Sequence, residues 1–303
     1  TQYRVQTTLQ SLENPTKFGS DDNITTSPAT PVPNGDFSET ALTIDTELQI
    51  GADWKYGGPT YHTTGKFKYS EPVGGWASIN KKTFYEKANP QNSWFVVAST
   101  YKSEDNVVIR TVGYNHSGTL PEARSNSGKY YNPEAPGYNS FIRCSGELFL
   151  GSYDFNGIEA RTEGIEFNAR PTSLEFKYKY EPQQVISRGS VEVKIYAEDG
   201  ISVINTRKMY IYKDGETMSD FKLWLHRYPF GVKPGKICIK FLSSDLEEGF
   251  DIETKLPTGD KLDAGVKSLL NKTAKDNSDV AVSVGSVLTI SDLKFNYGEK
   301  QNE

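Results

Sequence analysis

The sequence predicts an all-β protein with antiparallel strands. Its 303 residues include 18 Tyr and 15 Phe, which favour strands, together with 26 Gly and 15 Pro, which separate short strands. Alternating runs recur from residue 34 onward, without the strand and helix alternation of parallel folds. In residues 173–180, SLEFKYKY, apolar and charged positions alternate, as in a strand with one buried face. This strand alone fits a sandwich or a barrel, and the dominance of strand patterns along the chain favours a two-sheet antiparallel sandwich.

The expected elements follow in chain order. Residues 1–33 are expected to be an N-terminal arm, because residues 20–33, SDDNITTSPATPVP, are polar and rich in proline. Gly200 and Gly215 each follow an aspartate and supply the positive φ that a hairpin turn needs. Pro171 cannot donate to a ladder and is expected at the start of a strand. The predicted strands are residues 42–50, 94–99, 107–114, 140–153, 157–168, 173–180, 190–197, 203–212, 221–225, 237–242 and 286–297.

Two long connections interrupt the strands. Residues 115–139 are polar and too long for a plain hairpin turn, which is typical of a functional or disordered loop. Residues 245–283 are expected to be an insertion, in which residues 259–273 carry Leu and Val at the spacing of a short surface helix. Apart from the arm, the chain is therefore expected to hold one domain at 34–298 and a short tail at 299–303.

The charge of the chain excludes some partners. The formal net charge is −5 and no dense basic run is present, which argues against a nucleic acid or an anionic membrane. No apolar run approaches the roughly 18 residues of a membrane helix. The chain starts at Thr1 without a hydrophobic leader, so we expect a removed secretion signal or lipid anchor. The expected location is secreted, periplasmic or on the outer-membrane surface.

Cysteine and histidine add little chemistry. Cys144 and Cys238 each lie in an apolar run that resembles a strand, where a free thiol acts as a small buried hydrophobe. A single disulfide between them is the alternative in an oxidising compartment. The 3 histidines are far apart, and none has a partner at the spacing of zinc ligands.

Four segments resemble a known family. They are residues 34–37, NGDF; residues 72–80, PVGGWASIN; residues 164–180, GIEFNARPTSLEFKYKY; and the pair 239–244, IKFLSS, with 284–297, VGSVLTISDLKFNY. Together they resemble the carbohydrate-metabolism domain found in surface proteins of gut bacteria, some of which are lipoproteins. The third segment is the most specific of the four.

The resemblance implies a jelly-roll β-sandwich of the galactose-binding or carbohydrate-module type, with a short helical insertion. It implies carbohydrate binding or metabolism but assigns no catalytic residue, because this fold hosts lectins, binding modules and enzymes. Related modules hold a structural Ca²⁺ ion where the first and last strands meet, which makes Asp36, Glu39 and Asp292 the candidate ligands. The family pattern has two acids in the last strand, and Ser291 replaces the first of them here.

Aromatic residues near glycine turns are the candidate sugar contacts. Sugars present flat C–H faces and a rim of hydroxyl groups, so their sites need exposed rings and planar polar side chains. Residues 53–61, DWKYGGPTY, place Trp54, Tyr56 and Tyr61 around a Gly-Gly-Pro turn. Trp76 follows another Gly-Gly pair. The alternative for both tryptophans is burial in the core.

Further candidates lie in loops and at a strand corner. Tyr130, Tyr131 and Tyr138 fall in the long polar loop, where they either contact a ligand or fix the loop to its scaffold. Arg170 can bind a carboxylate or a uronate, and the alternative is an ion pair with Glu163 or Glu166.

Three functions fit these observations. The first is a glycan-binding accessory protein of a cell-surface carbohydrate-utilisation system, whose partner is an oligosaccharide or polysaccharide. The second is a glycoside hydrolase or lyase, which would need a carboxylate pair about 5 Å or 6.5–9.5 Å apart. None of the 39 acids stands in a distinctive setting for that role. The third is a surface module that binds another protein.

Overall fold

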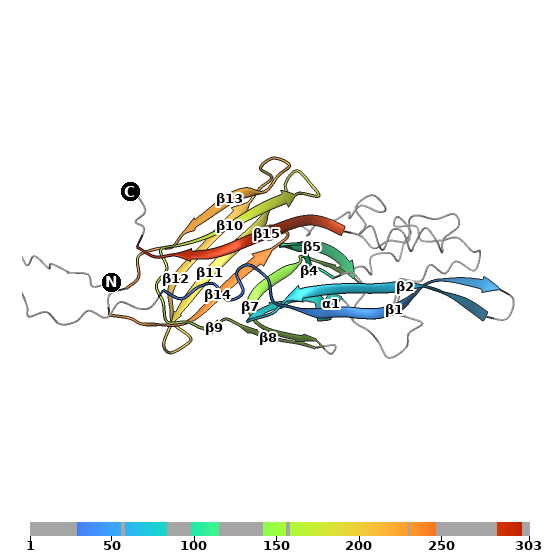
Figure 1. Cartoon of the computed structure of the whole chain (residues 1–303), viewed down its shortest axis with the longest axis horizontal. Helices are drawn as coiled ribbons and strands as arrows, with labels where there is room; N and C mark the ends of the chain where they lie inside the picture. The colour runs from blue at the N-terminus through green and yellow to red at the C-terminus, as the bar shows by residue number, and fades with distance from the viewer. Residues whose placement is uncertain are drawn as a thin grey trace, which may run out of the picture.

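The computed structural model describes residues 29–55, 58–83, 98–114, 142–155, 158–229, 231–246 and 284–298. In these ranges nearly every element is a strand, and the one helix, α1 (Asn80–Thr83), has 4 residues. Two antiparallel sheets face each other as a sandwich, beside a separate two-stranded hairpin (Figure 1). The prediction of an all-β antiparallel sandwich is confirmed.

The first sheet has 7 strands, with β8 and β9 pairing off the main order β12-β11-β14-β7-β3. Its strands are β3 (Trp76–Ser78), β7 (Glu147–Phe155), β8 (Glu159–Glu163), β9 (Ile165–Glu166), β11 (Gly189–Ala197), β12 (Val203–Ile211) and β14 (Pro234–Leu242). We call it the seven-stranded sheet. The Glu198-Asp199-Gly200 turn joins β11 to β12, and Gly200 has the expected positive φ of 69°.

The second sheet has 6 strands in the order β13-β10-β15-β5-β4, with β6 pairing to β5. Its strands are β4 (Thr100–Ser103), β5 (Asn106–Tyr114), β6 (Ile142–Cys144), β10 (Ser173–Glu181), β13 (Ser219–Trp224) and β15 (Val284–Asn296). The chain changes sheet between β10 and β11, and again at each step from β12 to β15. Such alternation is how a jelly roll builds two packed sheets from one chain.

The core lies between the sheets, and β10 shows how the sequence pattern sets its boundary. Leu174, Phe176, Tyr178 and Tyr180 are all buried, whereas Lys177 between them is exposed. The Phe176 ring lies 4.8 Å from that of Phe221 and 5.2 Å from that of Phe241, which belongs to the opposite sheet. The predicted buried face of this strand is therefore correct.

Arg170 and Pro171 form a corner directly before β10, and this corner joins three segments. Pro171 directly precedes the strand, as expected, and its carbonyl accepts a hydrogen bond from the Tyr228 hydroxyl at 2.9 Å. The N–H of Thr172 donates to the Asn296 carbonyl at 2.7 Å, and its own carbonyl accepts from the Leu225 N–H at 3.0 Å. The motif thus ties the start of β10 to the ends of β13 and β15.

The NGDF motif forms a turn that closes one side of the core. The Asn34 side chain donates to the carbonyls of Glu39 and Val73 at 2.8 and 2.9 Å and accepts from the Glu39 N–H at 3.0 Å. Phe37 is fully buried, and its ring lies 5.7 Å from that of Trp76. Asn34 and Phe37 of this motif therefore hold the turn in place and fill the core beneath it.

One edge of the sandwich is closed by a buried amide. Asn80, which is 1% exposed, accepts from the Thr100 N–H at 3.0 Å and donates to the Thr100 carbonyl at 2.6 Å. Its Nδ2 also donates to Glu71 at 2.9 Å, and its Oδ1 accepts from the Ser99 hydroxyl at 3.0 Å. Asn80 follows β3 and Thr100 begins β4, so one side chain joins the edges of the two sheets.

The hairpin of β1 (Thr40–Lys55) and β2 (Gly58–Pro72) is the main departure from the predicted elements. A strand was expected at residues 42–50, but β2, β3 and β4 were missed. The hairpin lies beside the sandwich at its base and extends beyond it at its far end (Figure 1). Its base is held where the Tyr69 ring lies 5.3 Å from that of Tyr101, with the buried Arg110 guanidinium 4.7 Å from the Tyr101 ring.

Several predicted segments lie outside the described residues. These are most of the N-terminal arm, the polar loop of residues 115–139, the helix expected at residues 259–273 and the C-terminal tail. Within the described part, no helix is long and apolar enough to cross a membrane. Cys144 and Cys238 are free thiols, and burial raises the pKa of each to about 12. They therefore lack the thiolate character of a reactive cysteine.

Candidate functional site

The predicted aromatic cluster lies at the far end of the hairpin. Ala52 pairs with Tyr61 and Trp54 pairs with Pro59, so Trp54 and Tyr61 occupy diagonal positions across the two strands. The structure describes the backbone at both residues, and Tyr56 lies outside the described residues. Tyr130, Tyr131 and Tyr138 also lie outside them.

Trp76 belongs to the core rather than to a ligand-binding surface. Its side chain is 5% exposed, and its ring lies between those of Phe37 at 5.7 Å and Phe241 at 6.3 Å. Its indole N–H donates to the Pro33 carbonyl at 2.8 Å. The ring is therefore buried beside two other aromatic rings and its polar atom is bonded, which corrects its assignment as a sugar contact in favour of the packing alternative.

Arg170 does not form the expected ion pair, and its role as a ligand contact stays a prediction. Its Nη2 donates to the Val232 carbonyl, and its guanidinium carbon lies 5.7 Å from the centre of the Tyr228 ring. Glu163 instead pairs with Arg161 at 3.4 Å and with Lys240 at 3.5 Å. Among the described residues Arg170 has no ion pair with Glu163 or Glu166, so the expected pairing is wrong. The cause is that Glu163 faces the outer side of the seven-stranded sheet.

Two of the three candidate calcium ligands have other side-chain partners. The Asp36 carboxylate accepts from the backbone N–H and the hydroxyl of Ser38, and these bonds lower its pKa. Asp292 pairs with Lys177 at 3.2 Å. Within the described ranges, no group of 3 or more His, Cys, Asp or Glu side chains could hold a metal ion, so Asp36, Glu39 and Asp292 do not form one. A structural Ca²⁺ ion stays a prediction.

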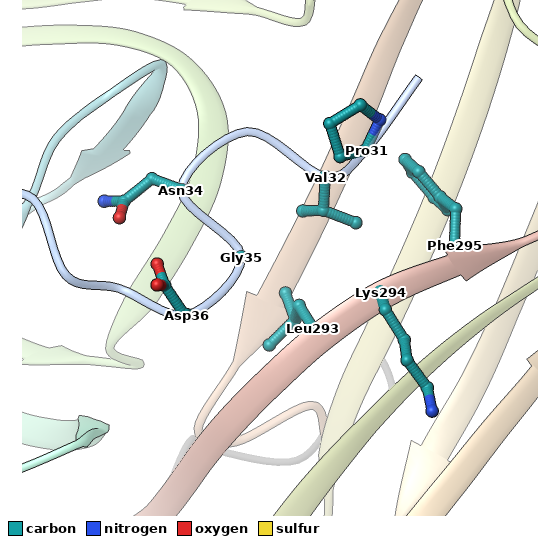
Figure 2. Close-up of a pocket in the computed structure, with 8 residues that line it drawn as sticks. All are labelled: Pro31, Val32, Asn34, Gly35, Asp36, Leu293, Lys294 and Phe295. Carbon is teal, nitrogen blue, oxygen red and sulfur yellow. The ribbon is translucent and has the colours of Figure 1, made fainter. Parts of the chain in front are cut away.

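A hollow of about 360 Å³ lies where the segment before β1 meets β15 (Figure 2). Val32, Leu293 and Phe295 surround it, while Lys294 extends away. Its polar side chains are already engaged, because Asn34 bonds three backbone groups, Asp36 bonds Ser38 and Lys294 pairs with Glu175 at 3.2 Å. The hollow is therefore a largely apolar seam between two segments, and its one aromatic ring, that of Phe295, is only 9% exposed.

The outer face of the seven-stranded sheet carries a different surface, a lattice of half-buried charges. Glu192 on β11 pairs with Lys194 at 3.0 Å and with Lys240 of β14 at 3.9 Å. Lys240 also pairs with Glu163, which links the lattice to β8. Arg161 of β8 then pairs with Glu147 and Glu163, and its guanidinium carbon lies 4.2 Å from the ring centre of buried Phe149.

Two cations of this lattice have raised pKa values. Burial lowers the pKa of Lys194, but its hydrogen bond and charge interaction with Glu192 outweigh that effect, so the pKa is raised. The pKa of Arg161 is likewise raised, because the charges of Glu147 and its neighbours outweigh the effect of burial. Fixed donors and acceptors therefore cover the central strands of this face at neutral pH.

Two tyrosines lie at the ends of this charged surface. Tyr196 of β11 is half-buried, and the ammonium of Lys236 lies 4.5 Å from its ring centre. Tyr210 of β12 is 38% exposed, with the Arg188 guanidinium carbon 3.8 Å from its ring centre. Tyr210 pairs with Ser190, so these two side chains project from the same side of the sheet. Ser190 lies six positions before Tyr196 on β11, and residues an even number of positions apart on a strand share a face. Both tyrosine rings therefore project from the same side. We call the surface from Tyr196 to Tyr210 the outer-face platform.

The outer-face platform was not identified from the sequence. In residues 190–197, SVEVKIYA, the polar positions Glu192, Lys194 and Tyr196 alternate with buried Val and Ile, so their common face was readable. The partners Lys236, Lys240 and Tyr210 come from other strands. Only the pairing of those strands brings them together, and no local pattern predicts it.

Comparisons with known proteins do not assign a family. No protein-family model matches the chain, and no curated protein matches it. Similar solved structures include the enzymatically active domain of tailspike protein 4 from bacteriophage CBA120, at 10% identity and a TM-score of 0.29, covering 88% of this chain and 21% of that one. This chain thus spans about a fifth of the tailspike chain.

Two further solved structures match over most of both chains. One is the Stig cyclase Fisc from Fischerella sp. TAU, at 10% identity and a TM-score of 0.31, covering 89% of this chain and 97% of that one. The other is a carbohydrate-binding module of the β-sandwich superfamily, at 9% identity and a TM-score of 0.26, covering 90% and 98%. These scores are too low to carry an argument about function, so the site geometry has to carry it.

Proposed function

We propose that this protein binds glycans on the outer-face platform, as a secreted or cell-surface accessory protein of a carbohydrate-utilisation system. The observation that carries the proposal is the placement of Tyr196 and Tyr210 on one face of the sheet, with the ion pairs of Glu192 between them. Aromatic rings suit the C–H faces of sugars, and charged side chains form the stronger hydrogen bonds to hydroxyl groups.

The dimensions of the platform favour an oligosaccharide over a single sugar. Six residues of a strand span about 20 Å. Tyr210 lies opposite Ser190, so this is the approximate separation of Tyr210 from Tyr196 along β11. A chain of sugar units can contact both rings and the charged side chains between them. Trp54 and Tyr61 at the end of the hairpin are a second proposed contact, reached by a ligand that extends beyond the sandwich.

A glycan array followed by calorimetric titration of the best ligand tests the proposal. We expect Tyr196→Ala and Tyr210→Ala each to weaken binding about tenfold or more, which corresponds to about 1.4 kcal/mol. Trp224→Ala is the matched control, because Trp224 is also half-buried beneath a lysine, Lys222 at 4.1 Å, but belongs to the other sheet. This variant is expected to bind normally.

The outcomes separate the surfaces. If both platform variants bind glycan normally while Trp54→Ala and Tyr61→Ala lose glycan binding, the binding site lies on the hairpin. Loss in Trp224→Ala alone would place the ligand on the opposite sheet. A broad array on which the intact protein binds no glycan would overturn the proposal itself.

A further inference from the structure

The edge strand β12 carries polar residues at inward-facing positions, where core strands carry apolar ones. Strands β12 and β13 are the terminal strands of the two sheets and lie next to each other on one side of the sandwich. Asn205 and Arg207 pair with Ile195 and Val193, which are fully buried core residues. Because paired residues project from the same side of a sheet, both polar side chains point inward at this edge.

These two side chains converge on His226, which follows β13. The Asn205 Nδ2 donates to the His226 carbonyl at 2.6 Å, and the Arg207 Nη1 lies 3.4 Å from the His226 Nε2. Asn205 is 4% exposed, Arg207 is half-buried and His226 is exposed. The cluster therefore reaches from the interior to solvent along the open edge of the sandwich.

Two atoms of the cluster are buried without a partner. The Asn205 Oδ1, an acceptor, and the Arg207 Nε, a donor, both lack a hydrogen bond. Folded proteins satisfy most buried polar atoms, because an unpaired one has lost its bonds to water. An unsatisfied acceptor and donor in one cluster indicate a place for a group that can both donate and accept.

The charge of the cluster is also uncompensated. Among the described residues, Arg207 has no carboxylate within ion-pair distance, whereas Arg161 on the outer face has three glutamates. Next on β12, Lys208 projects from the opposite side and pairs with Asp245. A half-buried guanidinium without an acid partner favours an oxyanion, since its fork of N–H donors matches carboxylate and sulfate groups.

We propose that Asn205, Arg207 and His226 form a second binding site, for the carboxylate or sulfate ester of an acidic sugar. The anion accepts hydrogen bonds from the Nη groups of Arg207, and the edge opens on binding so that the buried Arg207 Nε and Asn205 Oδ1 also gain partners from the ligand. The identification of the ligand as a sugar rests on the proposed function, whereas the anion site rests on the cluster alone. The site would give the protein a preference for acidic glycans.

The direct test follows the Arg207 Nε–H signal by NMR while sodium glucuronate, glucose 6-sulfate or glucose is added. We expect a saturable shift of this signal with glucuronate or with glucose 6-sulfate. The ligand with the higher affinity identifies the acid group that the site prefers. We expect no shift with glucose. Absence of a response to both acidic sugars would overturn the site, and an equal response to acetate would overturn its assignment to a sugar.

Variants separate this site from the outer-face platform. Arg207→Gln and Arg207→Lys should each weaken glucuronate or sulfate binding about tenfold or more. Lys213→Gln is the matched control, because it removes the same charge from a residue that lies beyond the end of β12 and pairs with Glu216, and it should leave that affinity unchanged. Anion binding that survives both Arg207 variants would overturn the proposal. If the glycan array is blank while the Arg207 signal still responds, the proposed function fails and the anion site stands.

Discussion

The backbone of Leu293 lies against Gly35 so closely that no side chain fits between them. The Leu293 N–H donates to the Gly35 carbonyl at 2.9 Å, and a Cβ atom added at Gly35 would lie 2.3 Å from the Leu293 carbonyl oxygen. The contact joins the NGDF turn to the last strand. It explains why this position needs glycine although its φ is not positive.

Gly35→Ala should therefore lower the free energy of unfolding by about 1–3 kcal/mol, as overpacking of a tight contact does. Chemical denaturation measures this difference. Ser38→Ala, at an exposed position of the same turn, is the control and should cost less than about 1 kcal/mol. Equal stability of Gly35→Ala and the wild type would mean that the turn moves freely away from β15.

Phe176→Ala should cost about 3–5 kcal/mol, because Phe176 is 2% exposed and contacts aromatic rings from both sheets. Lys177→Ala is the control, since the Lys177 side chain is 51% exposed. This substitution should change the unfolding free energy by about 0.5 kcal/mol or less. A cost below about 1 kcal/mol for Phe176→Ala would contradict the placement of this face in the core.

Asn80→Ala should cost about 3 kcal/mol, because it leaves the backbone groups of Thr100 and the Ser99 hydroxyl without their buried partner. Thermal and chemical unfolding give the value. Lys81→Ala, whose side chain is 59% exposed, changes the next residue without touching this network and should be nearly neutral. A neutral Asn80→Ala would show that the two sheet edges stay joined without this amide.

The Glu175 carboxylate should make stability depend on acid pH. Its hydrogen bond from Lys222 is the largest cause that lowers its pKa from 4.5 to about 2. The stabilisation by the ionised form is therefore complete above about pH 4.5 and lost as the pH falls toward 2. We expect Glu175→Gln to be less stable than wild type at pH 6, and the difference to vanish near pH 2. A difference that is constant over this range would contradict the prediction.

Trp54→Ala and Tyr61→Ala should leave the thermal stability of the sandwich nearly unchanged, because both residues lie in the separate hairpin, far along its strands from the Tyr69 contact. If the hairpin contacts glycans, the same variants should lose binding on the array. Differential scanning calorimetry is the stability measurement. A loss of several kcal/mol in Trp54→Ala would assign that residue to packing.

The sequence by itself determined the fold class and the faces of the regular strands. In β10 and β11 the side chains alternate between the core and solvent, and this period is a property of the extended backbone. The faces could therefore be predicted before any strand was paired. The turn at Gly200 was also predictable, because the positive φ that glycine adopts there depends only on the local backbone.

The second strand of the hairpin was not predicted. The strand β2, GPTYHTTGKFKYSEP, pairs with β1 outside the sandwich, and its polar residues and glycines do not alternate as in a half-buried strand. The motif residue Trp76 shows the converse problem. Glycines beside it suggested exposure, but the packing of Phe37 and Phe241 around it decided its burial.

Only the tertiary structure decided the candidate sites. Tyr196 and Lys236 are 40 positions apart in the numbering, and β11 and β14 bring them together by pairing. Asn205 and His226 meet because β12 and β13, the terminal strands of the two sheets, lie next to each other at one edge of the sandwich. Backbone periodicity acts between neighbours along the chain, whereas strand pairing and sheet packing act across it. The sequence therefore determined which way each side chain points, and the packing determined which side chains it meets.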